Sequence, residues 1–300
     1  MAEDSNETML SLPEAVLLGH AMVQRVVDAL GIRAFFIKGP VSVLQGLREP
    51  RISGDVDVFV APSDVELILL ALEGRGWQQR PSEPESGSFP KHSVTIGHPR
   101  WPCCIDVHFR FPGMDRPAAR SFETMWANTV DIKIAGQEVR VPSIPLGILV
   151  VALHALRTPR HPTCRQELEF LSRFTSRHLY ADAVLKIAMA TGSLAAVRPF
   201  LEDLLSEHIP PEWPDPSLEW RNRGRAQEPG SARFIAIMQA PWRDKARLLW
   251  RALFPRSEVF LSGNIYADMS LTGRLRLHSD RWKRFLRGFP RLVRNLRGLR

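Results

Sequence analysis

The chain has 300 residues, of which 44% are hydrophobic and 24% are charged. These are ordinary values for a globular protein, so they exclude a mainly disordered chain. The length suits one large domain or two of ordinary size. Residues 273–300 contain ten lysines and arginines and one aspartate, which gives them a net charge of +9; since the whole chain carries +8, the first 272 residues carry −1. The basic character of the chain therefore says nothing about a ligand of its first part.

The three cysteines, two of them adjacent, make neither a disulfide framework nor a zinc-binding pattern, which fits a reducing compartment. The longest apolar run, residues 148–153, is far shorter than the roughly 18 residues of a membrane span. The N-terminal residues are acidic and lack the basic segment that begins a signal peptide. We therefore expect a cytoplasmic protein with no transmembrane segment.

The first half of the chain alternates between helical and extended patterns. In chain order, the patterns predict a helix from the capping box Ser11–Glu14 to Gly31, a strand over 34–37, a short helix over 39–47, a strand over 56–60, a helix from the capping box Ser63–Glu66 to Gly74 and Gly76, a polar loop over 81–90, and strands over 92–96, 103–111 and 137–141.

Helical spacing dominates the second half of the chain, beginning with residues 145–157. A polar stretch over residues 209–233, rich in proline and glycine, interrupts it and predicts a long loop. We therefore expect a mixed α/β domain over residues 1–142 and a mainly helical domain over residues 143–300.

The most informative segment runs from Arg51 to Val60 and contains the pair Asp55 and Asp57. Residues two apart in a strand point to the same face, so the two carboxylates are expected to project together while Val56 and its neighbours face the other side. Adjacent carboxylates repel unless a positive charge lies between them, and such oxygen-rich sites suit Mg²⁺ or Mn²⁺. Alone, an Asp-x-Asp pair is also compatible with an exposed sheet face.

A third carboxylate, Asp106, lies in another alternating strand about fifty residues later. Three strand carboxylates of this kind can hold two metal ions, which clamp the attacking and leaving oxygens of a phosphoryl displacement. Upstream, the strand over 34–37 runs into Lys38-Gly39 and a short helix. Such a turn can direct backbone N–H groups at a phosphate, and Lys38 would add a positive charge.

The order of these motifs resembles the uncharacterised nucleotidyltransferases of the DNA polymerase β superfamily. The resemblance rests on strand-Lys38-Gly39-helix, then Arg-x-x-Gly-Asp55-x-Asp57, then a histidine, then apolar-Asp106-apolar-His108, and it extends to the segments 142–155 and 248–255. It implies a small mixed sheet that carries the carboxylates, backed by helices. It also implies transfer of a nucleoside monophosphate from an NTP, such as ATP, to an acceptor, with release of pyrophosphate.

The resemblance also implies roles for single residues. Asp55 and Asp57 would bind both metal ions, and Asp106 would complete one site and help to deprotonate the acceptor. The expected nucleotide-binding residues are Lys38, Gly39, Arg51, Ser53, Gly54 and His108. Pro40 departs from the superfamily pattern, in which a serine or glycine follows this glycine, and Ser53 is also compatible with an ordinary turn serine.

Three histidines accompany these motifs. His92 and His108 match positions where the family often has histidine; His108 shares a strand face with Asp106 and could bind phosphate or orient that carboxylate. Both are also compatible with ordinary surface histidines. His154 lies in an apolar helix and is expected to be a hydrogen-bonded core residue rather than a ligand.

The C-terminal tail places aromatic and aliphatic residues at helical intervals among its arginines, and Pro290 is expected to split it into two short helices. We expect this amphipathic segment to dock on its own helical domain, because the aromatic residues share the face that would pack. Contact with an anionic membrane or with nucleic acid is the alternative.

These observations favour a Mg²⁺- or Mn²⁺-dependent nucleotidyltransferase that takes an NTP as co-substrate and modifies a small molecule, peptide or protein. A role in a biosynthetic tailoring pathway is associated with the family. The first alternative is an inactive protein of the same fold that binds a nucleotide, peptide or partner protein, and Pro40 mildly favours it. The second is an enzyme that modifies nucleic-acid ends through the basic tail.

Overall fold

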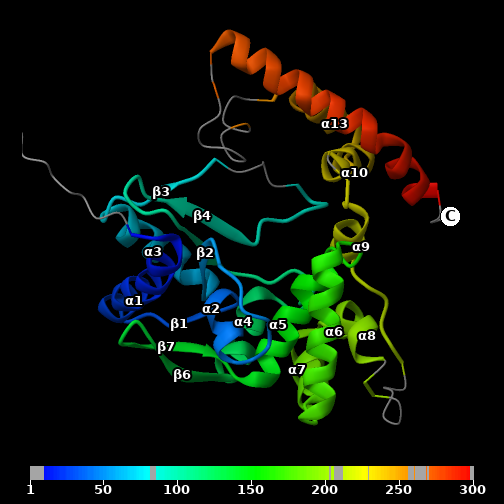
Figure 1. Ribbon diagram of the computed structural model, residues 1–300. Helices are drawn as coiled ribbons and strands as arrows, with labels where there is room; N and C mark the ends of the chain where they lie inside the picture. Colours follow the sequence, from blue (N-terminus) through cyan, green and yellow to red (C-terminus); the bar gives the residue numbers. More distant parts are fainter. Residues whose placement is uncertain are drawn as a thin grey trace, which may run out of the picture.

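The computed structural model describes residues 10–81, 86–202, 204–205, 212–228, 230–255, 260, 268 and 270–297. A five-stranded mixed sheet occupies the first half and helices dominate the second, as the sequence predicts (Figure 1). The first-half elements are α1 (Leu12–Leu30), β1 (Ala34–Phe36), α2 (Gly39–Leu44), β2 (Asp55–Val60), the 3-10 helix η1 (Pro62–Asp64), α3 (Val65–Glu73), β3 (Gln78–Gln79), β4 (Ser93–Gly97), β5 (Cys104–His108), α4 (Ala118–Trp126), β6 (Thr129–Ile134) and β7 (Gln137–Pro142).

The helical half begins directly after β7. Its elements are α5 (Ile144–Leu156), α6 (Pro162–Arg177), α7 (Ala181–Thr191), α8 (Leu194–Leu201), α9 (Leu218–Arg225), α10 (Ser231–Gln239), α11 (Trp242–Leu253) and α13 (Leu271–Arg297). Within the described residues, no helix is both long enough and apolar enough to cross a membrane.

The strand order β1-β2-β5-β4-β3 puts β2 and β5 side by side at the centre of the sheet. These two strands run parallel, whereas β1 pairs with β2, and β4 with both β5 and β3, in the antiparallel sense. Strands β6 and β7 form a separate antiparallel ribbon. The two strands that carry the aspartates of the sequence motifs are therefore direct neighbours.

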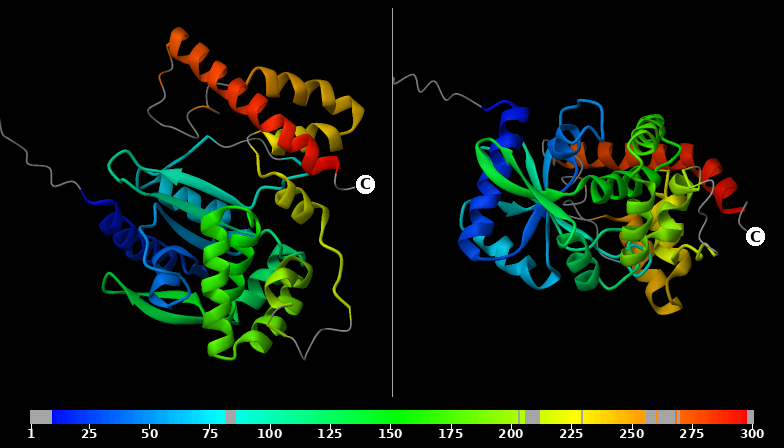
Figure 2. Two further views of the ribbon diagram at one scale, coloured as in Figure 1. Left: turned by 45° about the vertical axis from the view of Figure 1, so that its right-hand side comes forward. Right: turned by 90° about the horizontal axis from the view of Figure 1, so that it is seen from below.

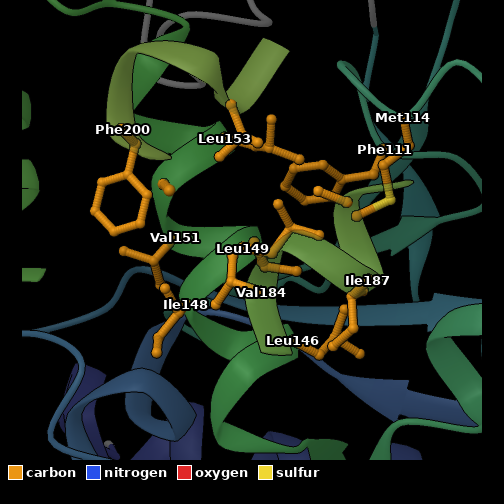
Figure 3. Close-up of a cluster of buried hydrophobic side chains, with 14 of the residues drawn as sticks. Phe111, Met114, Leu146, Ile148, Leu149, Val151, Leu153, Val184, Ile187 and Phe200 are labelled. Carbon is orange, nitrogen blue, oxygen red and sulfur yellow. The ribbon is translucent and has the colours of Figure 1, made fainter. Parts of the chain in front are cut away.

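Two hydrophobic clusters cover the two faces of this sheet. Val56, Val58 and Ile105 belong to one, together with residues of α1 and α3. Phe35 and Phe59 face the opposite way and join the second cluster, which contains nearly all of α5 and parts of α4, α7 and α8. Figure 3 shows α5 side chains of this cluster against residues of α7, α8 and the segment after β5. The second cluster thus joins the sheet to the helices that follow it.

Several local predictions are confirmed, and two are wrong in detail. The capping box of α1 forms, with Ser11 and Glu14 bonded to each other, and Gly31 ends the helix in the left-handed conformation. The helix expected after Ser63 also forms, but Ser63 lies in η1 and does not cap it. Residues 218–225, expected within the long loop over 209–233, are helical, and α10 begins at Ser231 inside that stretch; residues 209–211 and 229 of the stretch lie outside the described residues.

The tail is one helix rather than two, because α13 continues through Pro290. Proline has no N–H to donate to the carbonyl of Leu286, a residue that is exposed. The helix packs on α10 and α11, as the sequence predicts (Figure 2). The rings of Phe234 and Phe289 meet edge to face at 6.3 Å, and Nη2 of Arg281 donates to the carbonyl of Ala252 at 2.7 Å.

Candidate active site

The parallel pairing of β2 with β5 aligns Asp57 with Asp106 and Asp55 with Cys104. Asp57 lies two residues before Phe59 on β2, and His108 lies two residues after Asp106 on β5. Because side chains alternate along a strand, these groups project from the sheet face that α5 covers. The structure therefore brings together the two motifs that are fifty residues apart in the sequence.

Asp57 is the buried centre of this arrangement, with 4% of its surface exposed. Its Oδ1 accepts hydrogen bonds from Nζ of Lys38 and from Nε2 of His108, each at 2.7 Å. Burial alone would raise the pKa of the Asp57 carboxyl, but the charge of Lys38 and the bonds from His108 outweigh it and hold that pKa well below its usual value. Asp57 is thus a permanently ionised carboxylate at neutral pH.

Lys38 reaches Asp57 from a strained backbone position. It has φ 59° and ψ −150°, a region that residues with a side chain rarely adopt, and Gly39 follows with φ 46°. A Cβ on Gly39 would lie 3.2 Å from Oγ of Ser53, so a larger residue would crowd the turn as well. The sequence predicted that Lys38 faces the triphosphate; in this structure its ammonium group lies on Asp57.

Asp55 and Asp106 are half-buried neighbours of this ion pair. Oδ1 of Asp55 accepts a hydrogen bond from Oγ of Ser53 at 3.1 Å. Burial, together with the charges of Asp57 and Asp106, raises the pKa of Asp55. Oδ1 of Asp106 is inaccessible and has no hydrogen-bond partner among the described residues. The neighbouring carboxylates repel one another and one of their oxygens has no partner among the described residues, so a bound cation would stabilise this arrangement.

Among the described residues, Asp57, Asp106 and His108 form a group that could hold a metal ion, since one ligand atom of each lies within 4.8 Å of the others. The sequence assigned metal binding to Asp55, Asp57 and Asp106, so the geometry adds His108 and leaves Asp55 beside the group. Carboxylate oxygens suit Mg²⁺ or Mn²⁺, and the ammonium group of Lys38 already demonstrates that a cation fits against Asp57. The residues present therefore fit a divalent metal.

Two of the predicted nucleotide-binding residues, Arg51 and Gly54, have partners other than the three carboxylates of the site. Arg51 is partly exposed and approaches Glu167 of α6 at 3.7 Å, and Arg48 forms a buried ion pair with the same carboxylate. Gly54 precedes β2, and its carbonyl accepts a hydrogen bond from the backbone of Cys104 at 3.3 Å. The link from Arg48 to Glu167 has no signal in the sequence, because its partners are 119 residues apart.

The three histidines are buried or nearly so, and each ring has a low pKa. Burial and the charge of Lys38 lower the pKa of His108; burial, Lys38 and Arg157 lower that of His154 to about 2. Burial and Arg157 lower the pKa of His92 to about 2, and its ring lies 5.9 Å from that of His108. Nδ1 of His154 has no hydrogen-bond partner among the described residues, contrary to the bonded core histidine that the sequence predicted.

Among solved structures, an antigenic nucleotidyltransferase-like protein from Paracoccidioides brasiliensis is similar to the chain with a TM-score of 0.40 and 12% identity, over 65% of this chain and 88% of that one. The antibiotic-resistance factor ANT(2'')-Ia in solution gives a TM-score of 0.38 and 15% identity, over 65% and 97%. A tRNA nucleotidyltransferase complexed with a primer tRNA and an incoming ATP analogue gives 0.26 and 13%, over 85% and 86%.

Comparison with curated proteins by sequence gives no match. The sequence pattern of one family, described as "Uncharacterised nucleotidyltransferase", matches residues 16–213 and so spans more than half of the chain. The matched region contains the whole sheet, both carboxylate-bearing strands, and the helices α5 to α8 that back them. The chain therefore belongs to this family of uncharacterised nucleotidyltransferases.

Proposed function

We propose that the protein is a Mg²⁺- or Mn²⁺-dependent enzyme that transfers a nucleoside monophosphate from an NTP to a small-molecule, peptide or protein acceptor. The proposal rests on one observation: Asp55, Asp57 and Asp106 lie on neighbouring parallel strands. The chain that carries them belongs to a family of nucleotidyltransferases. Three carboxylates placed together repel one another, and metal ions that bind an NTP would relieve that repulsion.

In this proposal the acceptor oxygen attacks the α-phosphorus, the bond between the α- and β-phosphates breaks, and pyrophosphate leaves with the electron pair. Asp55, Asp57 and Asp106 would hold the metal, which supplies charge neutralisation at the phosphates and activation of the acceptor in the two-metal manner. Asp106, whose Oδ1 has no partner among the described residues, would take the proton of the acceptor.

Binding of the triphosphate is assigned to the turn after β1. The backbone N–H groups at Gly39 and the ammonium group of Lys38 would face the phosphates, with Ser53, Gly54 and Arg51 nearby. Lys38 would then leave Asp57 and move to the triphosphate, since a metal ion would replace its charge at that carboxylate. His108, bonded to Asp57 at 2.7 Å, would hold that carboxylate in place.

Labelled substrate distinguishes the proposed function from its alternative, an inactive protein that keeps the fold to bind a nucleotide or partner. We would incubate the protein with each NTP labelled at the α- or the γ-phosphate, in Mg²⁺ or Mn²⁺, together with fractionated metabolites and peptides. The proposed function predicts that only the α-label appears on an acceptor, and that Asp106→Asn abolishes it. Transfer of the γ-label, or equal transfer by Asp106→Asn, would contradict the proposal.

We also propose that the outer face of α11 and α13 contacts an anionic membrane surface. Trp242 and Trp250 are 85% and 64% exposed, and Phe254 at the end of α11 is exposed as well. Exposed arginines lie on the same two helices, among them Arg243, Arg247, Arg251, Arg276 and Arg287. Exposed tryptophans mixed with arginines are typical of helices that lie in the interface of an anionic bilayer.

A further inference from the structure

Arg157, which follows the last residue of α5, has two buried guanidinium nitrogens whose donors are unused among the described residues. Its guanidinium lies 4.8 Å from the centre of the Phe111 ring. Its Nε and Nη2 atoms are inaccessible and have no hydrogen-bond partner among the described residues. Burial and the nearby charge of Arg223 lower the pKa of Arg157 to about 9. An arginine whose donors are desolvated without a partner is costly, so it is typical of a site that a ligand completes.

The carboxylates near Arg157 are engaged by other residues. Glu219 accepts hydrogen bonds from both Arg110, at 2.6 and 3.2 Å, and Arg223, at 2.8 Å. Asp57 accepts its two bonds from Lys38 and His108. Within the part of the chain that the structure describes, Arg157 therefore has no carboxylate of its own, and the charges that act on it are those of Arg110 and Arg223 as well as those of Asp57 and Glu219.

A second unpartnered group lies one helical turn before Arg157. Nδ1 of His154 is inaccessible and has no hydrogen-bond partner among the described residues. The charges of Lys38, Arg157 and Asp57 all act on this ring, and those of Asp57 and Arg110 act on Arg157. Both groups are therefore near enough to Asp57 for the charge of that carboxylate to act on them.

We propose that Arg157, with His154 one helical turn before it, binds a phosphate or carboxylate group of a substrate near Asp57. A guanidinium group can donate two parallel hydrogen bonds to such an oxyanion, and Phe111 beneath it fixes the plane of the group. The inference rests on the proposed function, because it places this oxyanion on a substrate of the transfer reaction. The group has two possible sources, the triphosphate of the NTP or an anionic acceptor.

The test compares Arg157→Met and Arg157→Lys with the wild-type protein by calorimetric titration in Mg²⁺. The probes are ATP, tripolyphosphate and inorganic phosphate. The matched control is Arg140→Met, because Arg140 also stacks on an aromatic ring, at 4.7 Å from the centre of Trp126, but belongs to β7. We expect Arg157→Met to weaken oxyanion binding about ten- to a hundred-fold, Arg157→Lys to weaken it less, and the control to leave it unchanged.

The probes distinguish the two sources of the oxyanion. A parallel loss of ATP and tripolyphosphate binding assigns Arg157 to the triphosphate; retained ATP binding with loss of phosphate binding assigns it to the acceptor. Thermal unfolding distinguishes either binding role from a merely structural one. Arg157→Met removes an unpaired buried cation, so the melting temperature of the free protein should be equal or higher. A large fall in that temperature together with unchanged binding overturns the proposal.

Failure of the inference is distinguishable from failure of the proposed function. If the wild-type protein binds none of the probes, or if Arg157→Met binds them all as the wild type does, the oxyanion site is refuted. If ATP binding by the wild-type protein does not depend on a divalent metal, the proposed function fails. Arg157-dependent binding of inorganic phosphate would then still establish the oxyanion site.

Discussion

The ammonium group of Lys38 lies 2.7 Å from Oδ1 of Asp57, on the same oxygen that accepts the hydrogen bond of His108. Lys38 therefore supplies, in this structure, the positive charge that a metal ion at Asp57 would supply. Both side chains of this ion pair are about nine-tenths buried or more. The pair thus contributes to stability as well as to the chemistry we propose, and the two roles can be separated by mutation.

Asp57→Asn is expected to destabilise the protein by about 3 kcal/mol, because it leaves the buried ammonium group of Lys38 without its counter-charge. Adding Lys38→Met removes that charge and should restore most of the lost stability. Nucleotide transfer should be absent from both variants. Urea unfolding at pH 7 measures the free energies, and the Lys38→Met single variant completes the cycle. If Asp57→Asn is as stable as the wild type, the ion pair does not carry the stability assigned to it.

The backbone of Lys38 supports a second prediction. At φ 59° and ψ −150°, a glycine is expected to be more stable than an alanine by about 1 to 2 kcal/mol. We would compare Lys38→Gly with Lys38→Ala by urea unfolding, since both lose the same charge. The matched control is exposed Lys186 within α7, where glycine should be less stable than alanine by about 1 kcal/mol. The same order at both positions would refute strain at Lys38.

Gly147 in α5 is expected to tolerate no larger residue. A Cβ there would lie 2.6 Å from Cδ1 of Leu47, which is fully buried, and 3.0 Å from Oε1 of Gln45. Gly147→Ala should therefore destabilise the protein by about 1 to 3 kcal/mol. Gly224→Ala in α9 has open space around it and should instead stabilise by up to about 1 kcal/mol. A stabilising effect of Gly147→Ala in thermal unfolding would contradict the close contact between α5 and the segment after α2.

The surface of α11 and α13 gives a prediction for lipid vesicles. The protein should sediment with vesicles that contain phosphatidylserine but not with pure phosphatidylcholine vesicles, and binding should weaken as salt rises. Replacing Trp242 and Trp250 by serine should reduce binding on the order of ten-fold. Leu70→Ser, at an exposed apolar position on α3, is the control. Salt-sensitive binding to nucleic acid, without binding to vesicles, would replace the membrane by a nucleic-acid partner.

The sequence predicted the strands and the shared face of Asp55 and Asp57 because both depend on local patterns. Alternation of apolar and polar residues sets the face of a strand, and the family resemblance sets which strands are neighbours. The helix α1 was predicted for the same kind of reason, since a capping box marks its start and the left-handed Gly31 marks its end. Elements with weaker patterns, such as α4 and β6, were not predicted.

The partners of the side chains in the site could not be predicted from local patterns. Lys38, which was expected to face the triphosphate, bonds to Asp57, and Arg48 pairs with Glu167, because tertiary packing brings together residues far apart in the chain. Arg157 ends an apolar helix and has no motif around it. Its importance emerges only from the absence of a hydrogen-bond partner for its buried Nε and Nη2 within the described residues.

The central claim, a metal-dependent nucleotide site at Asp55, Asp57 and Asp106, is tested most directly by thermal unfolding with each of the four NTPs, in Mg²⁺, in Mn²⁺ and in EDTA. Asp106→Asn is the variant of choice, because Oδ1 of Asp106 has no partner among the described residues whose loss would disturb the fold. A ligand at a hundred times its dissociation constant adds about 2.7 kcal/mol of stability, which moves the midpoint visibly. We predict that at least one NTP stabilises the wild type only with metal, and that Asp106→Asn weakens this metal-dependent shift. Stabilisation that is equal in EDTA, or none with any NTP, would contradict the account.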